Sequence, residues 1–143
     1  MNILGGWEHK DVWDRKGKHF IVEVKRHEVA TFESGGCFDS DGAHRWCVYA
    51  YIYPQHPHFS KFEGPDIWQD AACAMPLHCG PSLLEYPTYE GKVTSVKVGC
   101  DYNHLHDTRF TRYAEPKEAH EVFQDAETLY EWLTKRETHS EAA

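Results

Sequence analysis

The stretch GCDYNHLHD, residues 99–107, gathers side chains that bind metal ions or transfer protons. His104 and His106 stand two positions apart in it, and Asp107 follows directly. If the segment stays extended, residues two apart point to the same side of the strand, so the two imidazoles would lie side by side. Imidazole and carboxylate groups bind zinc, iron or manganese, and three protein ligands suffice where a bound water is activated. The spacing therefore predicts a divalent metal site centred on His104, His106 and Asp107.

Two further residues are candidates to complete this ligand shell, namely Asp101 and the distant His78. The simplest alternative is that Asp101 and Asn103 only end a strand, through side-chain hydrogen bonds to the backbone of a turn. A third interpretation takes Cys79, next to His78 in MPLHCGPS, or Cys100 as a thiol nucleophile activated by a histidine.

The His-Leu-His triplet also resembles the histidine pair of the HUH single-strand DNA nucleases. That resemblance implies a divalent ion at the pair and a helical tyrosine nucleophile, for which Tyr130 is the candidate. The chain departs from the pattern, because Asn103 and Asp107 flank the pair where that family has an apolar strand. The formal net charge of −8 also opposes binding to a phosphate backbone.

A second group of aromatic and imidazole side chains follows the most apolar segment. It comprises Tyr49, Tyr51, Tyr53, His56 and His58. These side chains could line a pocket in which a ring-bearing ligand such as a nucleotide stacks. The alternative is that the tyrosines belong to a second packed layer over a sheet.

The hydrophobic pattern predicts the strands that position these residues. Residues 19–29 alternate apolar and polar side chains, which is typical of a half-buried strand. Residues 45–53 are apolar or aromatic on both faces and predict a central strand. Residues 83–89 and 92–102 predict a hairpin around Glu90-Gly91.

Helical periodicity dominates the C-terminal part of the chain. Apolar residues recur at spacings of three and four and predict a long helix over about 116–135, and residues 136–143 should form a frayed tail. The alternative is a break at Asp125, which could cap a shorter second helix. Gly64-Pro65-Asp66 predicts the start of a short helix around residues 65–74. Residues 1–143 are therefore expected to form one compact α+β domain, mainly an antiparallel sheet packed against the C-terminal helix.

The outer face of the predicted C-terminal helix is strongly acidic. Its candidate partner-binding residues are Glu115, Glu118, Glu121, Asp125 and Glu131. Such a face complements a protein with a basic surface. No direct contact with nucleic acid is expected from a chain of this charge.

The apolar runs and the cysteines indicate in which cellular compartment the protein is expected. The longest apolar run is too short to span a bilayer, so no membrane association is expected. Five cysteines without a CxxC pair argue against a disulfide framework and fit a cytoplasmic protein.

The segments WCVYAYIYPQHPHF, MPLHCGPS, VGCDYNHLHDTRFTRYA and VFQDAETLYEWL together resemble a group of small uncharacterised proteins of bacteriophages and other bacterial mobile elements. The resemblance implies a setting in which small acidic proteins inhibit host defence complexes, as anti-CRISPR proteins do. The leading hypothesis is therefore a non-enzymatic inhibitor of a host defence or nucleic-acid-handling complex, which needs no cofactor. The alternative is a metal-dependent hydrolase, or a metal- or nucleotide-binding protein, centred on His104, His106 and Asp107.

Overall fold

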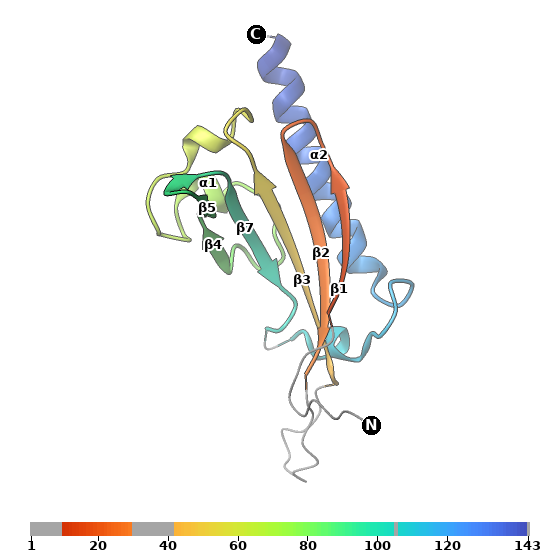
Figure 1. Cartoon of the computed structure of the whole chain (residues 1–143). Coiled ribbons are helices and arrows are strands. Elements are labelled where there is room, and N and C mark those ends of the chain that lie inside the picture. Colours follow the sequence, from red (N-terminus) through yellow and green to blue (C-terminus); the bar gives the residue numbers. More distant parts are fainter. Residues whose placement is uncertain (1–9, 30–41, 105, 143) are drawn as a thin grey trace.

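The structure is a computed structural model that describes residues 10–29, 42–104 and 106–142. Its centre is a five-stranded antiparallel sheet in the order β1-β2-β3-β7-β4, with the long helix α2 (His120–Ala142) along one face (Figure 1). The five strands are β1 (Lys10–Lys16), β2 (Phe20–Glu28), β3 (His44–Ile52), β7 (Val96–Asp101) and β4 (Leu83–Glu85). This architecture confirms the predicted α+β fold. No helix within these residues is long and apolar enough to cross a membrane.

The core lies between the sheet and α2 because alternate residues of each strand face the helix. In β2, every second residue from Phe20 to Arg26 is buried. In β3, Trp46, Val48, Ala50 and Ile52 are buried, as are the residues of the helix stripe at spacings of three and four. The buried stripe comprises Ala119, directly before α2, and Val122, Ala126, Leu129 and Leu133 within the helix.

The central position of β3 is confirmed, since β2 and β7 pair with it on either side. Within the described residues, its second face is only partly covered, however. Tyr49 and Tyr51 are only partly buried there, and the ammonium group of Lys97 lies 4.6 and 5.4 Å from their ring centroids. Lysine stems and cation–π contacts thus cover tyrosines that we expected under a second packed layer.

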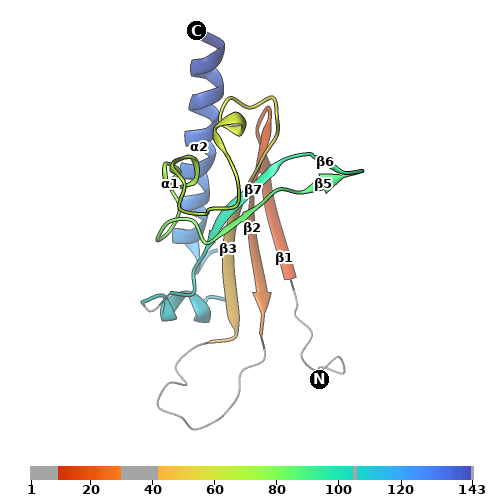
Figure 2. The same ribbon diagram turned by 90° about the vertical axis from the view of Figure 1, so that its left-hand side faces the viewer.

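The predicted hairpin forms in two parts. Thr88–Tyr89 (β5) pairs with Lys92–Val93 (β6), and this small hairpin extends away from α2 (Figure 2). Glu90 and Gly91 both have positive φ, the geometry of a tight two-residue hairpin turn. Before and after it, β4 and β7 pair again within the main sheet.

The helices differ from the prediction at their ends. α2 begins and ends later than expected and continues through Asp125 without a break. Residues 136–142, expected as a frayed tail, have helical backbone. The short helix α1 covers only Asp70–Cys73, because Gln69 binds the preceding loop with its amide: its Nε2 donates to the carbonyls of Glu63, Gly64 and Asp66. Two 3-10 helices, η1 (Phe59–Lys61) and η2 (Thr108–Arg112), complete the described elements.

Candidate metal centre

The segment GCDYNHLHD forms the end of β7 and the turn that follows it. β7 ends at Asp101, whose carboxylate accepts a hydrogen bond from the backbone N–H of Asn103 at 3.2 Å. The carboxylate of Asp107 accepts one from the backbone N–H of His104 at 3.0 Å. These two side-chain bonds turn the chain, as the simplest interpretation of the segment expected, but the second carboxylate is that of Asp107, where the sequence had suggested Asn103.

The turn separates the two histidines that the spacing rule placed side by side. Their predicted pairing required an extended strand through His106, and the strand ends before His104. The side chain of His106 is exposed and lies outside the group of potential ligands. The prediction of a chelating pair at His104 and His106 is therefore wrong in its geometry.

A different set of residues converges at this turn. His78, Cys79, His104 and Asp107 each offer one ligand atom, and these atoms all lie within 4.8 Å of one another. His78 and Cys79 come from the loop before β4, and His104 and Asp107 from the turn after β7. This group could hold a metal ion, because its donors are of the kinds that bind zinc and similar ions.

Asp107 is the centre of the group. Its side chain is 5% exposed and accepts hydrogen bonds from His78 Nε2 at 2.9 Å and from His104 Nδ1 at 2.9 Å. Burial raises the pKa of Asp107, but the amide of His104 and the two imidazoles outweigh it, so that the pKa is lowered overall. The ionised carboxylate thus lies between two imidazole nitrogens. A cation bound there would contact all three groups.

Packing fixes the orientation of His78. Its ring stacks on Tyr102 with centroids 4.3 Å apart and planes at 14°. The hydroxyl of Tyr102 donates to Asp125 of α2 at 2.6 Å, and Phe110 of η2 contacts the His78 ring edge-on. Such outer contacts set the direction in which a ligating nitrogen points.

Cys79 reaches the group through an unusual backbone conformation. It is a non-glycine residue with a φ of 59°, followed by Gly80 at 85°. The turn is closed by a hydrogen bond from Gly80 N–H to the Leu77 carbonyl at 2.9 Å. Left-handed residues other than glycine are uncommon, and they are found where the surroundings impose the conformation.

The other cysteine considered as a nucleophile is unsuited to that role. Cys100 is buried in the sheet, and burial raises the pKa of its thiol to about 12. A thiol with this pKa is protonated and unreactive near neutral pH. Of the two, only Cys79 combines exposure with neighbouring imidazoles.

The predicted aromatic pocket divides between the two sides of the sheet. Tyr49 and Tyr51 point away from α2, and Tyr53 follows β3 in a partly buried position. His56 and His58 are buried on the helix side, where His56 Nε2 bonds to the Leu133 carbonyl at 3.0 Å. Tyr49 and Tyr51 therefore lie on the other side of the sheet from the two histidines.

Three of the acidic residues proposed for partner binding make hydrogen bonds or ion pairs within the protein. Glu118 accepts hydrogen bonds from the backbone N–H groups of Ala114 and Glu115, Glu121 pairs with Arg109 at 3.0 Å, and Asp125 accepts from Tyr102. Glu115 and Glu131 are exposed.

Tyr130, the candidate nuclease tyrosine, contacts residues of β1 and β2. Its hydroxyl donates to the Lys16 carbonyl at 3.3 Å, and its ring packs on Phe20 with centroids 5.2 Å apart. These contacts place it over β1 and β2 and give it a packing role, while Leu105 of the His-Leu-His triplet lies outside the described residues.

Comparison of the chain with protein-family models, with curated proteins and with solved structures gives no match, so the site is interpreted from its own geometry.

Proposed function

We propose that this protein binds one zinc-class metal ion through His78, Cys79, His104 and Asp107, and that the ion joins the loop before β4 to the turn after β7. The observation that carries the proposal is the convergence of four donor atoms within 4.8 Å from two segments that are distant in sequence. In a tetrahedral zinc site with bonds of about 2.0–2.3 Å, donor atoms lie about 3.3–3.8 Å apart. The group needs to contract by roughly 1 Å to reach this geometry.

The donor set supports zinc rather than magnesium or calcium. Two imidazoles and a thiol are borderline or soft ligands, whereas the hard cations prefer oxygen. Four protein ligands fill every position of a tetrahedral ion, and such closed sites are structural. A hydrolytic role would instead need a water in place of one of the four.

The test is cobalt substitution of the untagged protein after treatment with a chelator. Cobalt bound to a thiolate gives a near-ultraviolet charge-transfer band, which the wild-type protein should show at one equivalent. Cys79→Ser should lose this band, and His104→Ala should lower zinc affinity by more than the roughly 10–100-fold that a lost outer-shell contact costs. His106→Ala is the matched control and should bind like the wild type.

Two outcomes would contradict the proposal. If wild-type protein takes up less than a tenth of an equivalent of cobalt and of zinc, the cluster is a hydrogen-bonded turn. If His106→Ala loses metal as completely as His104→Ala, the ion is held by a different ligand set.

We propose as a second function that the chain is an acidic binding protein that inhibits a host complex by protein–protein contacts. Its support is the net charge of −8 together with the exposure of Glu115 and Glu131 beside and on α2. This proposal is compatible with the first, since a structural ion would stabilise the domain that carries the surface.

A further inference from the structure

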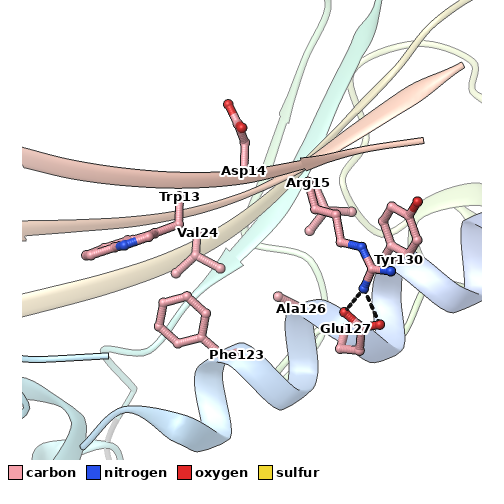
Figure 3. Close-up of a pocket in the computed structure, with 9 residues that line it drawn as sticks. Trp13, Asp14, Arg15, Val24, Phe123, Ala126, Glu127 and Tyr130 are labelled. Carbon is pink, nitrogen blue, oxygen red and sulfur yellow. Dashed lines mark hydrogen bonds and ion pairs between the residues drawn. The ribbon is translucent and has the colours of Figure 1, made fainter. Parts of the chain in front are cut away.

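A cavity of about 130 Å³ lies between α2 and the β1–β2 end of the sheet (Figure 3), and none of the proposed metal ligands lines it. Its walls are mainly apolar and aromatic. It is lined by apolar and aromatic residues of β1, β2 and α2 together with the charged residues Asp14, Arg15 and Glu127. We propose that this cavity binds a small, uncharged molecule with a single aromatic ring.

The cavity follows from side-chain alternation in β1. Trp13 and Arg15 point toward α2, while Asp14 between them points away from the helix (Figure 3). Residues two apart on a strand are about 7 Å apart. This spacing equals two contacts of about 3.5 Å, so one flat ring fits between the two side chains.

The helix leaves room because its residue facing this gap is small. Ala126 belongs to the buried stripe of α2 and is 7% exposed, and the larger Phe123 and Tyr130 stand on either side of it. Val22 and Val24, both nearly fully buried, form the base of the cavity. A purely apolar cavity of roughly 150 Å³ is known to hold benzene, so the volume here is close to what one aromatic ring needs.

One wall of the cavity is rigidly held. Trp13 stacks on Trp46 with centroids 5.7 Å apart and planes at 22°, and Phe123 contacts both rings edge-on. A preformed wall loses little conformational entropy when a ligand binds.

The charges at the mouth determine the charge of the ligand. The Arg15 guanidinium bonds both oxygens of Glu127 and lies 3.9 Å from the centroid of the Tyr130 ring (Figure 3). The charges of Arg15 and Glu127 are paired with each other, and apart from Asp14, whose side chain points away from the helix, the remaining lining residues are apolar or aromatic. A carboxylate ligand would have to displace Glu127 from Arg15, so an uncharged ring is favoured.

The test uses phenol as the probe and the methyl resonances of Val22, Val24 and Ala126 as the readout. Phenol should shift these resonances saturably, with a dissociation constant on the order of 1 mM, as its small size dictates. Benzoate and cyclohexanol should bind at least fivefold more weakly. Tighter binding of benzoate would overturn the assignment of an uncharged ligand, and equal binding of cyclohexanol would overturn its aromatic character.

Substitutions test whether the cavity is a binding site or only a void left by imperfect packing. Ala126→Leu should fill the cavity, abolish the phenol shifts at Val22 and Val24 and raise the melting temperature, with Ala126→Val as the smaller change if leucine prevents folding. Gln124→Leu places the same leucine side chain at an exposed position of α2 and should leave phenol binding unchanged. If wild-type resonances do not move at 20 mM phenol, or move equally in a folded Ala126 variant, the proposal is wrong.

Discussion

Protonation of His58 should destabilise the fold in mild acid. This side chain is 3% exposed, its Nε2 donates to the Ala71 carbonyl at 2.8 Å, and its Nδ1 has no hydrogen-bond partner among the described residues. Burial lowers the pKa of His58 to about 4, and the nearby charges of Lys61 and Arg136 act in the same direction. The native state therefore holds His58 neutral.

The magnitude follows from the difference between the native and unfolded pKa values. From an ordinary pKa of 6.5 to about 4, the shift is about 2.5 pH units, and each unit corresponds to about 1.36 kcal/mol. Because the native pKa is lowered, the unfolded chain binds the proton more readily below pH 6.5. The free energy of unfolding should therefore decrease by about 3 kcal/mol as the pH falls from 6.5 to 4, a large part of a typical total of 5–15 kcal/mol.

The assay is urea unfolding at a series of pH values between 7.5 and 4, with chelator present throughout. In His58→Gln, the amide keeps a donor for Ala71 but cannot be protonated, so the loss of stability over this range should be smaller by about 3 kcal/mol than in the wild type. His120→Gln, which changes an exposed histidine, should retain the wild-type pH dependence. Parallel stability curves for the wild type and His58→Gln would refute the reasoning, because the acid-sensitive proton would then bind elsewhere.

Two further predictions concern the sheet and the acidic helix. Gly99→Ala should lower the free energy of unfolding in urea by about 1–3 kcal/mol, since an added Cβ would lie 2.2 Å from the Val48 carbonyl oxygen and force β7 away from β3; unchanged stability would mean that the strands can separate freely there. The double variant Glu115→Lys/Glu131→Lys should lose basic proteins that the wild type retains from a bacterial lysate at matched salt, with an unchanged melting temperature. Equal retention by both proteins would remove these two residues from the proposed interface.

The sequence predicted the elements whose signal is local. Alternation in residues 19–29 and the three-four spacing of the C-terminal stripe both reflect burial of one face, and β2 and α2 form where these patterns occur. β1 was not predicted, because KDVWDRK contains only two apolar residues. It is a strand because every one of its residues pairs with β2, which is a long-range effect.

The metal centre shows the same division between local and long-range information. Asp107, His104 and His78 were all among the predicted ligands, and the structure brings them together. The extended geometry failed because two aspartate side chains bond backbone N–H groups and turn the chain. Cys79 was considered only as a nucleophile, since nothing in its local sequence reports that His104 and Asp107 lie beside it.

The two edge strands of the main sheet, β1 and β4, affect whether the protein can self-associate. An exposed border strand offers unpaired backbone groups to other chains and promotes aggregation. β4 has only three residues before the chain reaches Pro87, so an incoming strand would find few groups to pair with. β1, on the opposite border, carries charges of both signs along KDVWDRK, which an identical strand would have to desolvate. Both borders thus oppose growth of the sheet by strand addition, and this should keep the protein dispersed at the concentrations that the metal and phenol titrations require.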